Sequence, residues 1–183
     1  GSIPYQQYVL GPTASLASIL KAEGYSTLAF HPGERASWQR DRAYPRLGFD
    51  SYKCGDDMDV PQTFEHGYVS DQSDFEQIIW ELEHKEEGKP LFLFNVTIQN
   101  HGGYAMSYTN FSQEIYVTNM NGIYPKANRY LSLVKRSDEA FQELVDYFSN
   151  VSEPTILCMF GDHLPSIEDG FYEELFGTSL DHL

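Results

Sequence analysis

Three short apolar runs, separated by stretches with helical periodicity, constrain the fold of this 183-residue chain most strongly. The runs cover residues 25–30, 91–97 and 154–160, and each begins at or directly after a glycine or a proline. Such a run is typical of a strand that is buried on both faces. Because helical patterns precede and separate the runs, the sequence predicts an α/β fold with a mainly parallel sheet flanked by helices.

The helical patterns have recognisable boundaries. We expect helices over about 13–23, 37–47 and 128–149, and a further helix that begins at Ser70-Asp71. Thr13 is the expected N-cap of the first helix, and Gly24 its C′ residue. The stretches without clear periodicity are 3–11, 48–70, 102–126 and 164–183. A loop as long as 102–126 is usually functional in a compact domain.

Composition narrows the class of protein. With 27 Asp and Glu residues against 12 Lys and Arg residues, the chain has a formal net charge of -15. Nucleic acids and anionic membrane surfaces are therefore not expected to bind it directly, since both require a basic patch. Two cysteines do not indicate a disulfide framework. An anionic substrate would need a local cation, either a metal ion or a few placed Arg and His side chains.

The predicted domain organisation is simple. Residues 3–183 are long enough for one domain, and no apolar run approaches the roughly 20 residues of a membrane span. Gly1 and Ser2 are typical of the residues that remain after a tag is removed. The sequence thus predicts one domain over 3–183.

A histidine follows each of the three apolar runs. His31, His101 and His163 are three of only six histidines, and Asn100 and Asp162 precede two of them. The carboxyl ends of parallel strands share one edge of a sheet, where ligands of open α/β folds bind. An ordinary loop histidine explains any one of them, but three at one edge favour a site. Asp162 and His163 have the oxygen and imidazole donors that metal ions use.

Two further side chains follow the first run closely. Arg40 suits a phosphate or sulfate group, because its planar fork bonds two oxygens at once. Trp38 suits packing against a sugar or a glycerol, with a role as a core anchor as the alternative. The acidic stretch 56–59 is better explained as a solvated loop than as a calcium site, since it lacks the EF-hand spacing.

Six short motifs occur in a specific order. They are GYSTLAFH at 24–31, SWQR at 37–40, LGFD at 47–50, GYVSD at 67–71, VTIQNH at 96–101 and FGDHLP at 160–165. Together they resemble the lipoteichoic acid synthase and phosphoglycerol transferase family of the sulfatase and alkaline phosphatase superfamily. The resemblance covers nearly the whole chain.

The resemblance implies roles for these residues. Asp162 and His163 would be two ligands of a catalytic Mn²⁺ or Mg²⁺ ion. His101 would be catalytic, in contact with the phosphate or the leaving group. The substrate-binding residues would be His31, Trp38, Arg40 and Asn100.

The resemblance also implies a cellular setting. Family members are anchored by transmembrane helices, with the catalytic domain outside the bacterial cell membrane. They transfer phosphoglycerol from an anionic phospholipid to a glycolipid or glycan acceptor through a covalent threonine intermediate. That threonine and a further acidic ligand are expected upstream of residue 1, so the chain is expected to be an internal, inactive part of the domain, truncated at both ends. Pro32-Gly33 departs from the family's usual Gly-Asn.

Two other functions compete with this one. A sulfatase or phosphodiesterase of the same superfamily would hydrolyse its ester, and Trp38 and Arg40 favour the transferase over it. A binding domain of the same fold without activity is the third alternative. The acceptor, the lipid donor and the oligomeric state are left open by the sequence.

Overall fold

The computed structural model describes residues 3–178 of the chain, which divide into two compact units. Unit 1 comprises residues 3–63 and 72–98, and unit 2 comprises residues 64–71 and 99–178. Residues 1–2, predicted to remain from a tag, and residues 179–183, the end of the predicted domain, lie outside the described residues.

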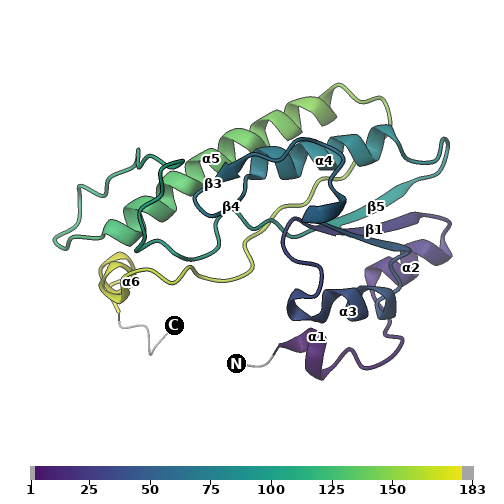
Figure 1. Ribbon diagram of the computed structural model, residues 1–183, viewed down its shortest axis with the longest axis horizontal. Coiled ribbons are helices and arrows are strands. Elements are labelled where there is room, and N and C mark those ends of the chain that lie inside the picture. The colour runs from purple at the N-terminus through teal and green to yellow at the C-terminus, as the bar shows by residue number, and fades with distance from the viewer. Residues whose placement is uncertain (1–2, 179–183) are drawn as a thin grey trace. The chain divides into compact units, whose positions relative to one another are not determined.

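Unit 1 contains a three-stranded parallel sheet in the order β2-β1-β5 (Figure 1). The strands are β1 (Ser26–His31), β2 (Ser51–Cys54) and β5 (Leu91–Asn95). The central strand β1 is almost wholly buried, as expected of an apolar run paired on both edges. Its register pairs Phe30 with both Lys53 and Asn95. The predicted α/β class, with a parallel sheet, is confirmed.

Helices lie on both sides of this sheet (Figure 1). On one side are α2 (Leu16–Ala22) and α3 (Arg40–Arg46), and on the other is α4 (Asp71–Glu83), whose first residue belongs to unit 2. The short elements of the unit are α1 (Pro4–Gln7), η1 (Ser37–Gln39) and η2 (Gly55–Asp57). The helices predicted at 13–23, 37–47 and from 70–71 are therefore present, the first shorter at both ends and the second preceded by a 3₁₀ turn.

The N-cap of α2 corrects one prediction. Ser15, rather than Thr13, caps the helix by accepting a hydrogen bond from the Ser18 backbone N–H, and the Ser18 hydroxyl oxygen accepts one from the Ser15 N–H. Thr13 instead donates its hydroxyl to the Gly11 carbonyl. A reciprocal capping box satisfies two backbone donors, which a lone threonine two residues earlier does not. Gly24 follows the helix with φ of +91°, as predicted for a C′ residue.

Aromatic side chains fill one side of the unit 1 sheet. Tyr44 of α3 is fully buried and meets four other rings edge-on, with centroids 4.9 to 6.2 Å apart, and these are Tyr5, Phe49, Tyr52 and Phe94. Edge-to-face pairs add stability beyond the area that they bury. Burial raises the pKa of Tyr52 to about 12, so its phenol stays neutral.

Unit 2 is built around the long helix α5 (Pro125–Ser149). The proline at its first position and its apolar stripe explain its formation. The unit also contains α6 (Asp169–Phe176) and the hairpin of β3 (Phe64–Glu65) and β4 (Tyr68–Val69). The Glu168 carboxylate accepts hydrogen bonds from the Lys126 and Ala127 N–H groups, and so satisfies the start of α5. No strand or helix lies within 99–124, as predicted for this loop.

Several predictions missed short elements. The stretch 48–70 contains β2, η2 and the β3–β4 hairpin, and 164–183 contains α6. The α5 helix starts three residues earlier than predicted. β2 is an edge strand of mixed polarity, so it lacks the continuous apolar run that marks β1 and β5. None of the described helices is long and apolar enough to cross a membrane.

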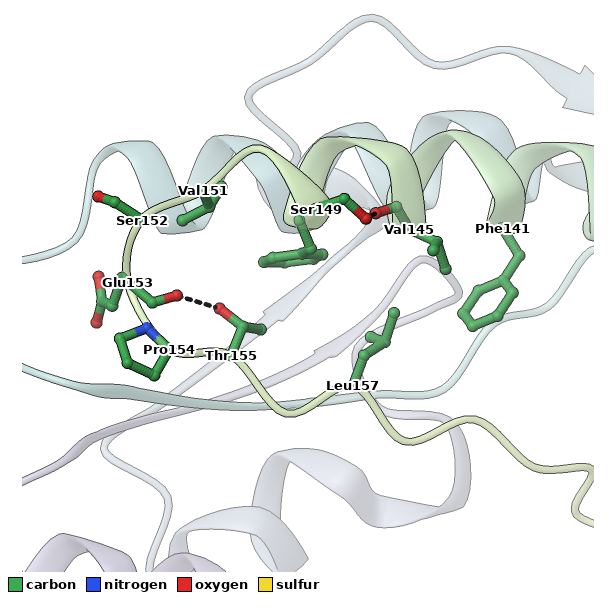
Figure 2. Close-up of a pocket in the computed structure, with 10 residues that line it drawn as sticks. Phe141, Val145, Ser149, Val151, Ser152, Glu153, Pro154, Thr155 and Leu157 are labelled. Carbon is green, nitrogen blue, oxygen red and sulfur yellow. Dashed lines mark hydrogen bonds between the residues drawn. The ribbon is translucent and has the colours of Figure 1, made fainter.

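The predicted strand at 154–160 is absent, and this prediction is wrong. The segment has no regular secondary structure, and Ile156 and Phe160 are 97% and 76% exposed. It runs beside the end of α5, where Leu157 and Phe141 point toward one another and line a hollow of about 450 Å³ (Figure 2). Within the described part of unit 2, the only strands are β3 and β4, with two residues each. The backbone of residues 154–160 therefore has no neighbouring strand in its own unit to pair with.

Candidate functional site

In unit 1, His31 is the last residue of β1 and is buried. Its Nδ1 lies 2.7 Å from the Val96 carbonyl oxygen, to which Nδ1–H donates. A Cβ atom at Gly33 would lie 2.5 Å from the His31 Nε2. A side chain at position 33 would therefore crowd this ring, so glycine fits here.

Trp38 and Gln39 adopt an unusual backbone between β1 and α3. Their φ angles are 60° and 57°, in the left-handed region that residues other than glycine rarely occupy. Trp38 is 48% exposed, so the alternative role of core anchor is wrong. The strained conformation instead holds a large apolar ring at the surface. Backbone strain of this kind clusters at ligand-binding sites.

Arg40 lies under that ring. Its guanidinium carbon is 5.4 Å from the centroid of Trp38, within the range of a cation–π contact. The residue is only 7% exposed, its Nη1 donates to the Ser37 carbonyl at 3.3 Å, and its buried Nε has no hydrogen-bond partner. A buried, partly unsatisfied guanidinium is a ready donor for an oxyanion, because burial without a partner is costly.

In unit 2, a buried polar network holds the residues around His101. The Ser137 hydroxyl of α5 accepts hydrogen bonds from Asn100 Nδ2 at 2.7 Å and Gln99 Nε2 at 3.1 Å, and donates to the Asp71 carboxylate. Gln99 Oε1 in turn accepts from the Asp71 N–H at 2.9 Å. The Asn100 amide is thus turned toward α5, and its buried Oδ1 has no hydrogen-bond partner. The network fixes the backbone that leads into His101.

His101 itself is exposed, and its Nδ1 lies 3.0 Å from the Tyr68 hydroxyl. Next to it, the Tyr104 hydroxyl donates to the Asn100 carbonyl. Burial raises the pKa of Tyr104, and the negative charge of Asp162 adds to that effect. Burial and the Asp162 charge likewise raise the pKa of Tyr130. Asp162 therefore lies in the electrostatic surroundings of the loop that carries His101.

Asp162 and His163 are both exposed. Their Oδ2 and Nε2 atoms are 3.5 Å apart, and Asp162 Oδ1 accepts a hydrogen bond from the His163 N–H at 2.8 Å. One carboxylate and one imidazole are donors that a divalent cation accepts, but a protein site normally has at least three. Among residues 3–178, no group of three or more His, Cys, Asp or Glu side chains is placed to hold a metal ion. The donor types fit a metal and their number does not complete a site.

The predicted residues therefore fall into two groups. His31, Trp38 and Arg40 belong to unit 1, and Asn100, His101, Asp162 and His163 belong to unit 2. Their gathering at one sheet edge stays a prediction. The third strand that was expected to deliver His163 is absent.

Sequence reasoning missed Tyr68, Gln99 and Ser137, which hold the neighbourhood of His101 together. Tyr68 and Gln99 lie inside motifs that were recognised. Ser137 lies in the middle of a helix without a motif, so no local signal marks it.

Comparison with known proteins identifies the family. The sequence model of the family described as Sulfatase matches residues 1–181. The chain belongs to the Sulfatase family, whose members include enzymes of the lipoteichoic acid synthase type.

One relative and two solved structures are most informative. The chain is 36% identical over 174 residues to the "Putative cyclic beta-1,2-glucan modification protein" of Rhizobium meliloti (strain 1021), a match that covers 91% of this chain and 26% of the relative. The lipoteichoic acid synthase LtaP from Listeria monocytogenes has the same fold, with a TM-score of 0.66 at 18% identity over 80% of this chain and 35% of LtaP.

The second structure is the Streptococcus pyogenes phosphoglycerol transferase GacH in complex with sn-glycerol-1-phosphate. Its TM-score is 0.56 at 16% identity, over 83% of this chain and 40% of GacH. The chain thus spans about a quarter of the length of the Rhizobium meliloti relative, about a third of LtaP and about two fifths of GacH. At these identities the two structures establish the fold.

Proposed function

We propose that this chain belongs to the catalytic domain of an enzyme that transfers phosphoglycerol from an anionic phospholipid to a glycan. The observation that carries the proposal is Arg40, a buried guanidinium with an unpartnered Nε, beside a tryptophan that a strained backbone holds at the surface. A chain with a net charge of -15 needs such a focused cation to accept an anionic head group.

The unit 1 residues supply substrate binding in this proposal. The guanidinium of Arg40 bonds the phosphate oxygens, and the ring of Trp38 covers the carbon skeleton of the glycerol. His31, whose ring is fixed by its bond to Val96, completes the pocket. All three residues lie at or soon after the carboxyl end of β1, where ligands of open α/β sheets bind.

The unit 2 residues supply the chemistry. His101 donates a proton to the alkoxide that leaves when the phosphate ester breaks. Asn100 is placed beside it by Ser137. Asp162 and His163 are proposed as two ligands of a divalent ion, Mn²⁺ or Mg²⁺. When bound, such an ion neutralises charge on the phosphate.

The relatives support the proposed acceptor and location. A relative named for modification of a cyclic glucan favours a glycan as the acceptor. The resemblance to lipoteichoic acid synthases supports a reaction at the outer face of a bacterial membrane, with the phospholipid head group as the proposed donor. Hydrolysis of a sulfate ester or of a phosphate diester is the second candidate. The family is described as Sulfatase, and an arginine binds sulfate as well as it binds phosphate.

The test uses a protein that contains the sequence of this chain and is as long as its relatives. Incubation with Mn²⁺, a phosphatidylglycerol with a fluorescent acyl chain and a glucan acceptor should release fluorescent diacylglycerol, and mass spectrometry should find glycerol phosphate added to the glucan. His101→Gln should lower the rate about 100-fold or more, as expected for loss of a general acid. His84→Gln, at an exposed histidine stacked on Trp80, is the matched control.

The result distinguishes the candidates. Diacylglycerol that appears only with acceptor present supports transfer. Release of free glycerol phosphate without acceptor, or turnover of an aryl sulfate, supports the hydrolase. No metal-dependent turnover of either substrate would overturn both.

A further inference from the structure

Tyr68 and His101 are joined by a hydrogen bond within unit 2. The Tyr68 hydroxyl lies 3.0 Å from the His101 Nδ1, and the two rings meet edge-on at 75° with centroids 5.4 Å apart. Among the described residues, Tyr68 is the hydrogen-bond partner of the His101 side chain. The orientation of the His101 ring therefore depends on Tyr68.

The chemistry of the two groups sets the direction of this bond. A neutral imidazole has one N–H donor and one bare nitrogen acceptor. The bare nitrogen is a better acceptor than a phenol oxygen, and a phenol hydroxyl is a good donor. With Tyr68 O–H donating to Nδ1, the proton of neutral His101 resides on Nε2. His101 then presents Nε2–H as a donor to a bound ligand.

The hairpin that carries Tyr68 is held rigidly. Glu65 pairs with Tyr68 across the β3–β4 ladder, and His66 at the turn has a φ of 59°. His66 is buried, and its Nε2 lies 3.2 Å from the Gly103 carbonyl, to which Nε2–H donates. Its ring packs on Tyr108 with centroids 3.9 Å apart. Burial lowers the pKa of His66, although its bond to the Gly103 carbonyl acts in the opposite direction.

The chain on both sides of His101 is consequently fixed. On one side Ser137 bonds Asn100, and on the other His66 bonds Gly103. The backbone of His101 is held between these two anchors, while its side chain is exposed and retains rotational freedom. Tyr68 removes that freedom. Loss of orientation in a reacting group is costly, because misplacement by about 1 Å lowers rates about 100-fold.

We propose that Tyr68 is a positioning residue for His101, which it holds in one ring orientation as the Nε2–H tautomer. The inference deepens the proposed function, since it rests on the role of His101 as proton donor. It adds that the donor atom is Nε2 and that the β3–β4 hairpin supplies its support.

The test is made on the chain of residues 1–183 and does not depend on turnover. Long-range ¹H–¹⁵N NMR spectra at alkaline pH report the tautomer of each histidine. In the unaltered chain, the Nδ1 of His101 should be pyridine-like and its Nε2 pyrrole-like. In Tyr68→Phe the two shifts should move toward each other, with a several-fold rise in the Nδ1–H population, and contacts between the two rings should be lost. An unchanged unfolding midpoint shows that Tyr68→Phe folds.

Tyr108→Phe is the matched control. Among residues 3–178 its hydroxyl bonds the Met106 sulfur, at 3.7 Å, and its ring packs on His66 rather than on His101. His101 shifts should stay unchanged in this variant. An Nδ1–H tautomer in the unaltered chain, or identical His101 shifts in Tyr68→Phe, would overturn the inference.

A kinetic arm separates this inference from the proposed function. In the active full-length protein, Tyr68→Phe should lower kcat about tenfold with little change in KM, because orientation and not binding is lost. Absence of transferase activity would remove the proposed function and leave the NMR result standing. Activity with identical kcat in Tyr68→Phe would remove the positioning role alone.

Discussion

The Nδ1 of His31 donates a hydrogen bond to the carbonyl oxygen of Val96 over 2.7 Å, across 65 positions of sequence. The bond joins the end of the central strand β1 to the residue that follows its neighbour β5. The Val96 N–H completes the link by donating to the Phe30 carbonyl at 3.1 Å. His31 therefore has a structural role beside the proposed one in substrate binding.

Replacement of this histidine should separate the two roles. His31→Leu removes the donor and leaves the half-buried Val96 carbonyl without this partner, so the free energy of unfolding should fall by about 1–2 kcal/mol. His31→Asn keeps a side-chain N–H donor near the same position and should recover part of that loss. Urea unfolding measures both. Equal stability of the leucine variant and the unaltered chain would contradict the structural role.

Ser137 should be the most sensitive serine of α5. Ser137→Ala leaves the Asp71 carboxylate and two amide groups without a shared partner, and should lower the free energy of unfolding by about 2 kcal/mol. Ser149→Ala is the control, since that exposed hydroxyl bonds only the Val145 carbonyl, and its effect should stay within about 0.5 kcal/mol. Similar melting curves for the two variants would show that the network adds no stability.

The pH dependence of the free energy of unfolding should reveal the contribution of Asp50. The hydrogen bond from Lys21 lowers the pKa of Asp50, and bonds from the Thr27 N–H and hydroxyl act in the same direction. A lowered pKa in the folded chain adds stability that is fully present above the unfolded value of about 3.9 and is lost as the pH falls through the folded value. Asp50→Asn should therefore reduce stability at pH 7 and have a smaller effect near pH 3. Urea unfolding at both pH values checks this, and an equal effect at both would contradict it.

The metal prediction depends on the number of ligands. Since Asp162 and His163 provide two donors, we expect weak binding when Mn²⁺ is titrated by calorimetry into residues 1–183, with little change in Asp162→Asn. In the active full-length protein, the same variant should abolish metal-dependent turnover, because an amide is a neutral and weaker ligand. Tight binding by residues 1–183 that disappears in Asp162→Asn would reveal a complete site within the chain.

Because the backbone at Gln39 is strained, substitution by glycine should stabilise the chain there, whereas glycine in a helix usually destabilises it. Gln39→Gly relieves a left-handed conformation that costs about 1–2 kcal/mol, and loses about 0.4–1 kcal/mol to the greater freedom of the unfolded chain. The free energy of unfolding should rise by up to about 1.6 kcal/mol. Gln142→Gly in the right-handed helix α5 should instead lower it by about 1 kcal/mol. Thermal unfolding distinguishes the two, and destabilisation by Gln39→Gly would contradict the strain.

The sequence was informative wherever a run of apolar residues had a partner in its own unit. β1 and β5 were predicted because each is a run of apolar residues. The prediction is correct because the two strands pair in a parallel sheet. The run 154–160 has the same composition, but a strand also requires a neighbouring backbone, which composition does not report. β2 was missed for the converse reason, since Ser51 and Lys53 interrupt its apolar pattern while β1 pairs with it.

The candidate site shows the same limit. The residue types at His31, Arg40, His101 and Asp162 are visible in motifs, so they could be proposed from sequence. The contact between Tyr68 and His101 joins positions 33 apart, and the bonds from Ser137 join positions 37 and 38 apart. No periodicity or motif encodes such pairs, because they depend on how loops are anchored to α5.

The left-handed backbone at Trp38 and Gln39 has a consequence for affinity. Because the strain is present before any ligand arrives, its free-energy cost falls on the stability of the chain and is not subtracted from binding. A loop that relaxed to the right-handed region would have to return to the left-handed conformation each time a ligand binds. Each 1.4 kcal/mol that this change costs would raise the dissociation constant about tenfold. Variants that relax this turn should therefore become more stable proteins and poorer receptors for glycerol phosphate.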